Sequence, residues 1–163
     1  MFDSNCSGLM DRLNVLGALI TQLQGLLSEI TAASKDAASY ATDSEAKADS
    51  KWDTQGLEAS YLAAGQAAHA RELAKVIAGL KGMKIASVQD TVISGSLVVC
   101  SMGDLTEGYL LCNQGGGNSI RFEGMEITMI TPESALGNAL IGKKRSSAFQ
   151  LPSGLVGRIE FVG

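Results

Sequence analysis

The chain has 163 residues, of which 45% are hydrophobic and 18% are charged, and its formal net charge is −4 at pH 7. This length fits one or two small domains and excludes a large multidomain enzyme, and the composition is that of a folded chain. The negative charge disfavours non-specific binding to free nucleic acid. No run of about 18 apolar residues is present, so we expect no membrane-spanning helix. Three cysteines without a CxxC motif predict a reduced, cytoplasmic compartment.

The composition changes near residue 83. Alanine is dense from residue 31 to residue 70, whereas both prolines, Pro132 and Pro152, lie in the second half. We therefore predict an α+β protein with a helical domain over residues 1–82 and a mainly β domain over residues 83–163.

The helical half carries a regular apolar seam. Its large residues alternate between spacings of four and three: Leu9, Leu13, Leu16, Ile20, Leu23, Leu27 and Ile30. A second segment, residues 52–80, shows the same alternation with mostly small residues. Paired seams of this kind predict an antiparallel coiled-coil hairpin, with arms about 50 Å long. The pairing that places Leu16 near Leu73 and Ile20 near Ala70 puts the turn at residues 42–47. Two separate helices in a globular bundle are the alternative.

The second half has the pattern of short strands separated by turns. We expect strands at residues 95–100, 109–112, 119–123, 125–130, 147–151 and 155–161. A short helix should begin with Thr131 as N-cap and end at Gly142. The run Gly115–Gly117 predicts a hairpin turn. Cys100 and Cys112 are expected to be buried as small apolar residues.

Residues 137–143 match the first seven positions of the phosphate-binding loop GxxxxGK. That loop needs Ser or Thr at the eighth position, a strand before it and a helix after it. Here Lys144 holds the eighth position, and the predicted helix precedes the motif. The pattern therefore favours a helix end followed by basic residues.

Acidic residues gather at the predicted hairpin tip. Asp43, Glu45 and Asp49 lie there, and Asp53 and Glu58 lie further down the second helix. Carboxylates at a helix N-terminus are stabilised as anions, and their oxygens suit a hard cation such as Mg²⁺. The alternative is that they only cap the helix.

Residues 131–144, Thr-Pro-Glu-Ser-Ala-Leu-Gly-Asn-Ala-Leu-Ile-Gly-Lys-Lys, resemble the hallmark of the Gre family of bacterial transcript-cleavage and elongation factors. Residues 95–99 and 152–154 resemble the start and the last turn of the same domain, and residues 53–64 resemble a divergent branch of the family. The resemblance implies an FKBP-like C-terminal domain that docks on RNA polymerase, and a hairpin that enters its secondary channel.

The resemblance also implies the chemistry. Two acidic tip residues of such factors help the polymerase to hold its second Mg²⁺ while backtracked RNA is hydrolysed. The factor is not an enzyme by itself, has no cofactor of its own and shares Mg²⁺ with the polymerase. In this chain Glu45 and Asp49 would ligate that ion, only within the complex.

The tip departs from the family pattern. Glu45 falls where the family has its Asp, and Ala48 falls where it has its Glu. Asp53 and Glu58 are an alternative pair. Stimulated cleavage and occupation of the channel without cleavage both stay open. The basic residues Lys143, Lys144 and Arg145 are candidate contacts to an acidic surface of the polymerase.

Two other functions are considered. A prolyl isomerase would need an aromatic-lined pocket, for which residues 83–163 offer few aromatic side chains. A structural coiled-coil protein would dimerise through the hairpin, whereas a closed hairpin is expected to be a monomer.

Overall fold

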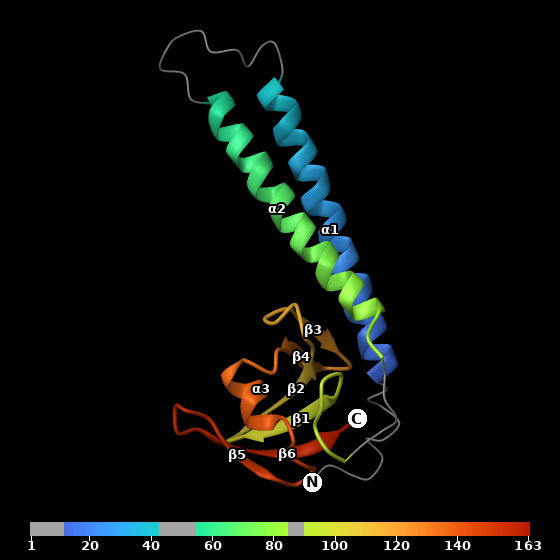
Figure 1. Ribbon diagram of the computed structural model, residues 1–163, viewed down its shortest axis with the longest axis vertical. Helices are drawn as coiled ribbons and strands as arrows, with labels where there is room; N and C mark the ends of the chain where they lie inside the picture. Colours follow the sequence, from blue (N-terminus) through green and yellow to red (C-terminus); the bar gives the residue numbers. More distant parts are fainter. Residues whose placement is uncertain (1–11, 43–54, 85–89) are drawn as a thin grey trace. The chain divides into compact units, whose positions relative to one another are not determined.

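The computed structural model describes residues 12–42, 55–84 and 90–163 (Figure 1). Two long helices come first, α1 (Arg12–Thr42) and α2 (Gln55–Lys81). Six strands and one short helix follow: β1 (Leu97–Met102), β2 (Leu105–Leu111), β3 (Ser119–Phe122), β4 (Met125–Ile130), α3 (Ala135–Leu140), β5 (Ala148–Gln150) and β6 (Val156–Val162). The predicted α+β class, with a helical hairpin before a β-rich domain, is confirmed.

Contacts group the chain into two compact units. One contains residues 21–78, and the other contains residues 1–20 together with residues 79–163. The domain boundary predicted between residues 82 and 83 stays a prediction.

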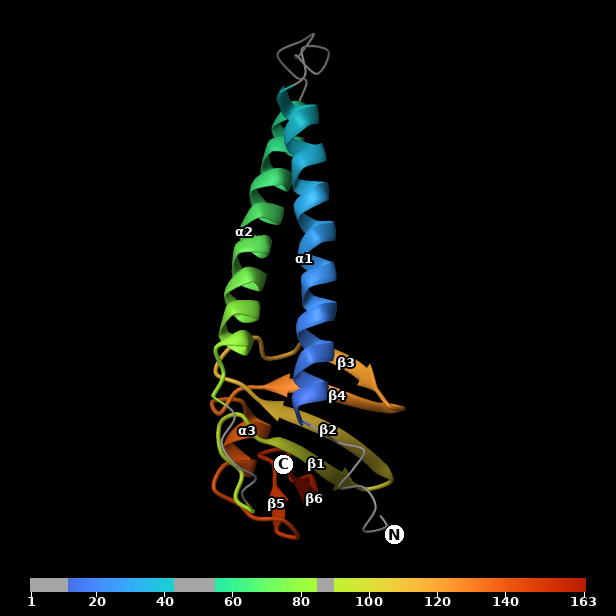
Figure 2. The ribbon, with the colours of Figure 1, turned by 90° about the vertical axis from the view of Figure 1, so that its right-hand side faces the viewer.

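The two long helices form the hairpin and lie side by side in Figures 1 and 2. Ser34 Oγ on α1 donates a hydrogen bond to the backbone oxygen of Ala63 on α2, at 3.1 Å. The predicted seam of α2 is confirmed over residues 59–80, where its members are buried or half-buried and most residues between them are exposed: Ala59, Ala63, Gln66, Ala70, Leu73, Ile77 and Leu80. Trp52, the first residue of the predicted seam, lies outside the described residues. Small residues in this seam allow close approach of α1.

The predicted register of the hairpin is wrong. It would place Ser34 opposite residue 55 or 56, whereas Ser34 bonds to Ala63. The displacement is about one heptad, which leaves seam facing seam, so the spacing alone cannot distinguish the two registers. A shift of one heptad brings Leu23, in place of Leu16, opposite Leu73, and both Leu23 and Leu73 are buried. Leu13, a predicted seam residue, is 58% exposed.

One described helical segment, Arg12–Ser39 of α1, is long and apolar enough to cross a membrane by length and composition alone. This differs from the expectation that no such segment exists. A helix whose apolar residues pack in a hairpin passes the same test. The expected absence of a membrane partner stays a prediction.

The strands form one sheet in the order β3-β4-β2-β1-β6-β5 (Figure 2). The pair β2–β4 is parallel, and all other neighbours are antiparallel. The loop that contains Gly115–Gly117 joins β2 to β3, which are not neighbours, so the predicted hairpin turn there is wrong. The tight hairpin joins β3 to β4 instead. Its two turn residues, Glu123 and Gly124, both have positive φ, as a type I′ turn requires.

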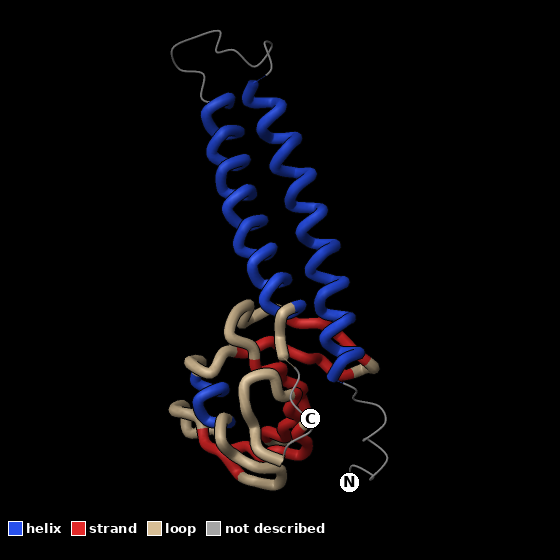
Figure 3. The backbone as a smooth tube through the Cα atoms, turned by 45° about the vertical axis from the view of Figure 1, so that its right-hand side comes forward, coloured by secondary structure: helices blue, strands red, loops and turns tan. Residues whose placement is uncertain are grey.

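Successive side chains of a strand point to opposite faces of a sheet, and here buried residues lie on both faces. Figure 3 shows α3 beside the strands on one face of the sheet. The buried cluster on this face consists of Val92, Val98, Cys100, Tyr109, Leu111, Ile130, Leu140, Phe149, Ile159 and Val162. On the other face Leu97, Leu110, Ile127 and Met129 are fully buried. The sheet is therefore the centre of a two-sided core.

The first turn of α1 is bonded to the backbone just before β1 and just after β6. Arg12 Nη1 donates to the backbone oxygens of Gly95 and Gly163, each at 3.2 Å. Val15 and Leu19 follow on the next turns and are fully buried, although neither belongs to the predicted seam. The start of α1 is therefore anchored where β1 begins and β6 ends.

The two described cysteines, Cys100 and Cys112, are buried free thiols, as predicted. Burial raises the pKa of each from 9.0 to about 12. Because burial favours the neutral thiol, the two protonated thiols contribute fully to the stability of the folded state below about pH 9. This contribution is lost as the pH rises towards 12. We expect the free energy of unfolding to fall over this interval.

At pH 8 the folded thiols should react with a disulfide reagent about a thousandfold more slowly than the unfolded chain, because their thiolate fraction is that much smaller. Absorbance with Ellman's reagent, on a Cys6→Ser variant with and without urea, measures both rates. Equal rates would contradict the burial of the thiols.

Candidate functional site

The region that resembles the Gre hallmark forms a closed turn followed by α3. The sequence predicted Thr131 as the N-cap of this helix, but the N-cap is Ser134. Ser134 Oγ accepts a hydrogen bond from the backbone N–H of Gly137 at 3.0 Å. It also donates to the backbone oxygen of Thr131 at 2.7 Å. Thr131 and Pro132 therefore belong to the turn before the helix, because the serine hydroxyl satisfies the free helical N–H.

Gly137 is required by a close backbone approach inside this turn. A Cβ on Gly137 would lie 2.0 Å from the backbone oxygen of Thr131. That atom is held in place by its bonds to Ser134 and is not the end of a flexible side chain. The glycine thus lets α3 fold back onto residues 131–134.

The predicted basic residues lie in the loop after α3, which we call the basic loop (Lys143, Lys144 and Arg145). Gly142, with φ of 77°, ends the helix as predicted. Gly137, the first residue of the GxxxxGK pattern, lies within α3, so the helix precedes the rest of the pattern. The prediction that this is not a phosphate-binding loop is therefore confirmed. A second segment holds the loop: Val92 N–H donates to Lys143 O, and Gly142 N–H donates to Val92 O, each at 2.8 Å.

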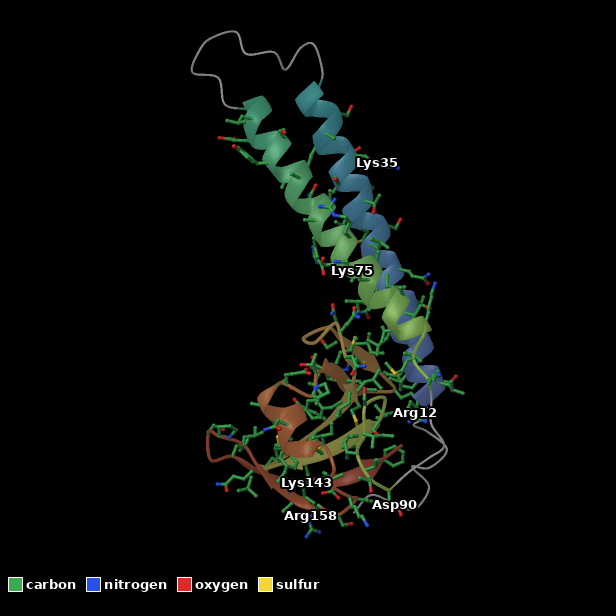
Figure 4. The ribbon with its side chains drawn as sticks, viewed as in Figure 1. Arg12, Lys35, Lys75, Asp90, Lys143 and Arg158 are labelled. Atoms are coloured by element: carbon green, nitrogen blue, oxygen red, sulfur yellow. The ribbon has the colours of Figure 1, made fainter. Side chains whose placement is uncertain are left out.

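Further contacts fix the end of the basic loop. Arg145 N–H donates to Asp90 O at 3.2 Å, and Arg145 Nε donates to Glu160 O at 3.0 Å. Figure 4 shows Lys143 and Arg158 at the same end of the domain. Arg158 is exposed on β6, opposite Ala148. Among the described residues, none of these four basic side chains forms an ion pair. The result is a group of basic side chains on a backbone that several hydrogen bonds hold in place.

A cavity of about 310 Å³ opens between α3 and the chain around β5. It is lined by Ala135, Asn138, Ala139, Gln150, Leu151 and Pro152, and we call it the α3–β5 groove. No aromatic side chain lines it, so it lacks what a prolyl isomerase site was expected to need. Sequence reasoning missed this groove and also Arg158, because small and amide residues distant in the chain give no motif.

The predicted acidic site lies almost wholly outside the described residues. This holds for Asp43, Glu45, Asp49 and Asp53. Glu58 is exposed in the first turn of α2. No cluster of three or more His, Cys, Asp or Glu side chains that could hold a metal ion occurs among residues 12–42, 55–84 and 90–163. His69 is exposed, as expected.

Two half-buried carboxylates in the sheet have structural partners. Tyr109 Oη donates to Glu107 Oε2 at 2.5 Å, and Ser101 Oγ donates to Glu160 Oε1 at 2.6 Å. Burial first, and then the hydrogen bond to Glu107, raise the pKa of Tyr109. The phenol therefore stays neutral and serves as a hydrogen-bond donor within the core.

No protein-family model matches the chain, and no curated protein matches it. Solved structures do resemble it. GreA factor homolog 1 (Gfh1) of Thermus thermophilus has 16% sequence identity and a TM-score of 0.34, covering 88% of this chain and 94% of its own. Thermus aquaticus Gfh1 has 18% identity and a TM-score of 0.35, covering 91% and 93%.

A third structure, of the transcription factor Gfh1, has 18% identity and a TM-score of 0.36, and the match covers 91% of this chain and 92% of its own. Because all three TM-scores lie below 0.5, the function has to be argued from this chain's own residues.

Proposed function

We propose that this chain is a Gre-like transcription elongation factor. It binds RNA polymerase, inserts the hairpin tip into the secondary channel and promotes Mg²⁺-dependent cleavage of backtracked RNA. The observation that carries the proposal is the antiparallel pair α1 and α2, whose connecting segment, residues 43–54, contains four carboxylates. The resemblance of residues 131–144 to the Gre hallmark supports the same function independently of the hairpin.

The dimensions of the hairpin suit this role. α1 has 31 residues and α2 has 27, so they are about 45 and 40 Å long at the rise of an α-helix. The seam of α2 is mostly alanine near the connecting segment, which keeps the pair thin. A thin helical rod is a simple way to bring carboxylates into a narrow channel.

The proposed chemistry needs little from the factor. The polymerase supplies one Mg²⁺ and most ligands of the second, and Glu45 and Asp49 add carboxylate oxygens to it. Mg²⁺ keeps its waters unless several ligands converge, so the free factor should bind the ion weakly. The factor would then be an accessory protein without catalytic activity of its own, acting as a monomer in the cytoplasm.

A second candidate is occupation of the channel without cleavage. The residue that favours it is Ala48, which stands where the Gre pattern has a glutamate. With one carboxylate missing, the tip could block the channel but hold the second Mg²⁺ poorly. Glu58 is exposed in the first turn of α2, and Asp53, which lies outside the described residues, would then have no role in cleavage.

One experiment separates these functions. Purified protein is passed over immobilised core RNA polymerase and then added to stalled, backtracked elongation complexes. Binding with faster RNA cleavage supports the proposal, and binding with unchanged or slower cleavage supports the second candidate. Failure to bind the polymerase would overturn both.

The basic loop is the proposed docking contact, and its charges can be tested separately from its backbone. The double replacement Lys143→Ala with Lys144→Ala should weaken polymerase binding about three- to tenfold at low salt, mainly through slower association. The difference should shrink as salt screens the charges. Surface plasmon resonance over a salt series measures both effects.

The matched control is Lys81→Ala with Lys84→Ala, which removes the same charge from exposed positions outside the basic loop. Arg145 is left unchanged because its side chain also bonds to Glu160. Equal effects of the two double variants would show that only net charge matters.

A further inference from the structure

We propose that the α3–β5 groove binds an extended, acidic peptide segment of a partner protein, which adds to the sheet as a strand beside β5. This binding site goes beyond the proposed function and does not depend on the identity of the partner. It rests on the backbone of β5, the shape of the groove and the charge around it.

The backbone of β5 offers unused hydrogen-bonding groups. β5 is the last strand of the sheet. Leu151 N–H donates to Leu155 O at 2.8 Å, and Ile159 N–H donates to Ser147 O at 2.9 Å. Because the bonds of a ladder alternate along a strand, the N–H and C=O groups of Ala148 and Gln150 point away from β6. Both residues are exposed, and no described strand pairs with this edge.

The groove lies where the side chains of an added strand would go. It is bounded by α3 on one side and by Gln150, Leu151 and Pro152 on the other. Side chains of an added strand alternate between the two faces of the sheet. Those on the α3 face would enter the groove, where Ala135 and Ala139 leave room for a medium-sized apolar group. Peptides that bind by strand addition gain affinity from main-chain hydrogen bonds and specificity from pockets for alternate side chains.

The charge around this edge selects an acidic segment. Arg158 is the register partner of Ala148 and lies on the face opposite the groove. The basic loop comes directly before β5. Three acidic residues lie on adjoining segments: Glu133, exposed before α3, and Asp90 and Glu160, whose backbone oxygens bond to Arg145. The Glu160 carboxylate already accepts a hydrogen bond from Ser101, and the groove lining itself carries no charge, so the four basic residues are the main charges offered to a ligand. An alternating apolar and acidic sequence matches both faces.

Amide hydrogen exchange followed by NMR tests strand addition at single residues. The probe is a blocked hexapeptide of alternating valine and glutamate, added to the full ¹⁵N-labelled protein. We expect the amides of Ala148 and Gln150 to exchange about tenfold more slowly once about nine-tenths of the protein is bound. The amide of Phe149 already points towards β6, so its exchange rate should change little. Unchanged exchange at Ala148 and Gln150 with saturating peptide would overturn the proposal.

Two N-methylated forms of the same peptide test the backbone contact without altering the protein. In one form the odd-numbered amides are methylated, and in the other the even-numbered amides. Only one set can face β5, so one form should lose binding and the other should keep it. Equal affinities would exclude an added strand and leave only side-chain attraction.

Charge selection is tested with a valine–lysine peptide and with matched variants. The lysine peptide should bind at least about tenfold more weakly at low salt. Arg158→Gln should weaken the glutamate peptide severalfold, whereas Arg121→Gln, an exposed arginine on β3 at the other edge, should leave it unchanged. Equal binding of both peptides, or equal effects of both variants, would refute the acidic preference. None of these measurements involves the polymerase, so their failure is distinct from failure of the proposed function.

Discussion

Replacing Glu45 and Asp49 with alanine should abolish any stimulation of transcript cleavage while leaving polymerase binding nearly unchanged. These two residues lie between α1 and α2 in the chain, and neither belongs to the apolar seam pattern. Their loss removes the carboxylate oxygens proposed to hold the second Mg²⁺. Cleavage of backtracked RNA, measured at several Mg²⁺ concentrations, should fall to the rate of the polymerase alone. Binding is measured in parallel on immobilised polymerase.

A second pair of changes, Glu45→Gln with Asp49→Asn, tests the negative charge by itself. These variants keep size and polarity but remove the negative charge, so they should also lose cleavage. If the alanine variant kept full activity, the assignment would move to Asp53 and Glu58. If the unaltered protein bound polymerase without cleavage, channel occupation would be the function.

Gly137→Ala should be among the most destabilising single changes in the β-rich domain. The added Cβ would lie 2.0 Å from Thr131 O, an impossible contact with a backbone atom that is itself hydrogen-bonded. Either α3 or the turn over residues 131–134 must move. Displacement of Leu140, which is fully buried, would then open the core. We expect a loss of about 3 kcal/mol or more in the free energy of unfolding, measured by urea denaturation.

Gly25→Ala is the control, since Gly25 is also helical but has no atom within 4 Å of the added Cβ. It should stabilise α1 by about 0.5–1 kcal/mol, because alanine has the higher helix propensity. A change below about 1 kcal/mol in the free energy of unfolding for both variants would contradict the close approach of Thr131 O to Gly137.

Polymerase binding by the Gly137→Ala variant gives a second measurement. The basic loop is positioned by Val92 and by the end of α3, so a displaced α3 should weaken docking even at temperatures where the chain stays folded. Normal polymerase binding by a destabilised variant would show that docking through the basic loop does not depend on the position of α3.

Local patterns in the sequence were enough to predict much of this protein. The alternation of four and three residues gave both helices and the seam of α2, because seam burial follows directly from helical periodicity. A glycine marked the end of α3 at Gly142, since that position needs a positive φ. The strands β3 and β4 also appear where alternation predicted them. The basic loop follows from its position just after the helix.

Other features were decided only by tertiary structure. The hairpin register depends on which heptads meet, and a shift of one heptad leaves the same periodic pattern. The parallel pairing of β2 with β4 is a long-range choice that the turn residues Gly115–Gly117 do not reveal. Ser134 displaced Thr131 as the N-cap because its hydroxyl can reach both Gly137 and Thr131.

The α3–β5 groove belongs to this second group. Its lining comes from two segments, residues 135–139 and residues 150–152, which carry no shared motif. Whether a strand lies at the edge of a sheet depends on the order of all strands, and β5 has an open edge only because the sheet ends there. Periodicity acts between neighbours on one element, so it determines helices, strands and seams. Register, strand order and cavities arise from contacts between elements distant in the chain, and only the folded structure decides them.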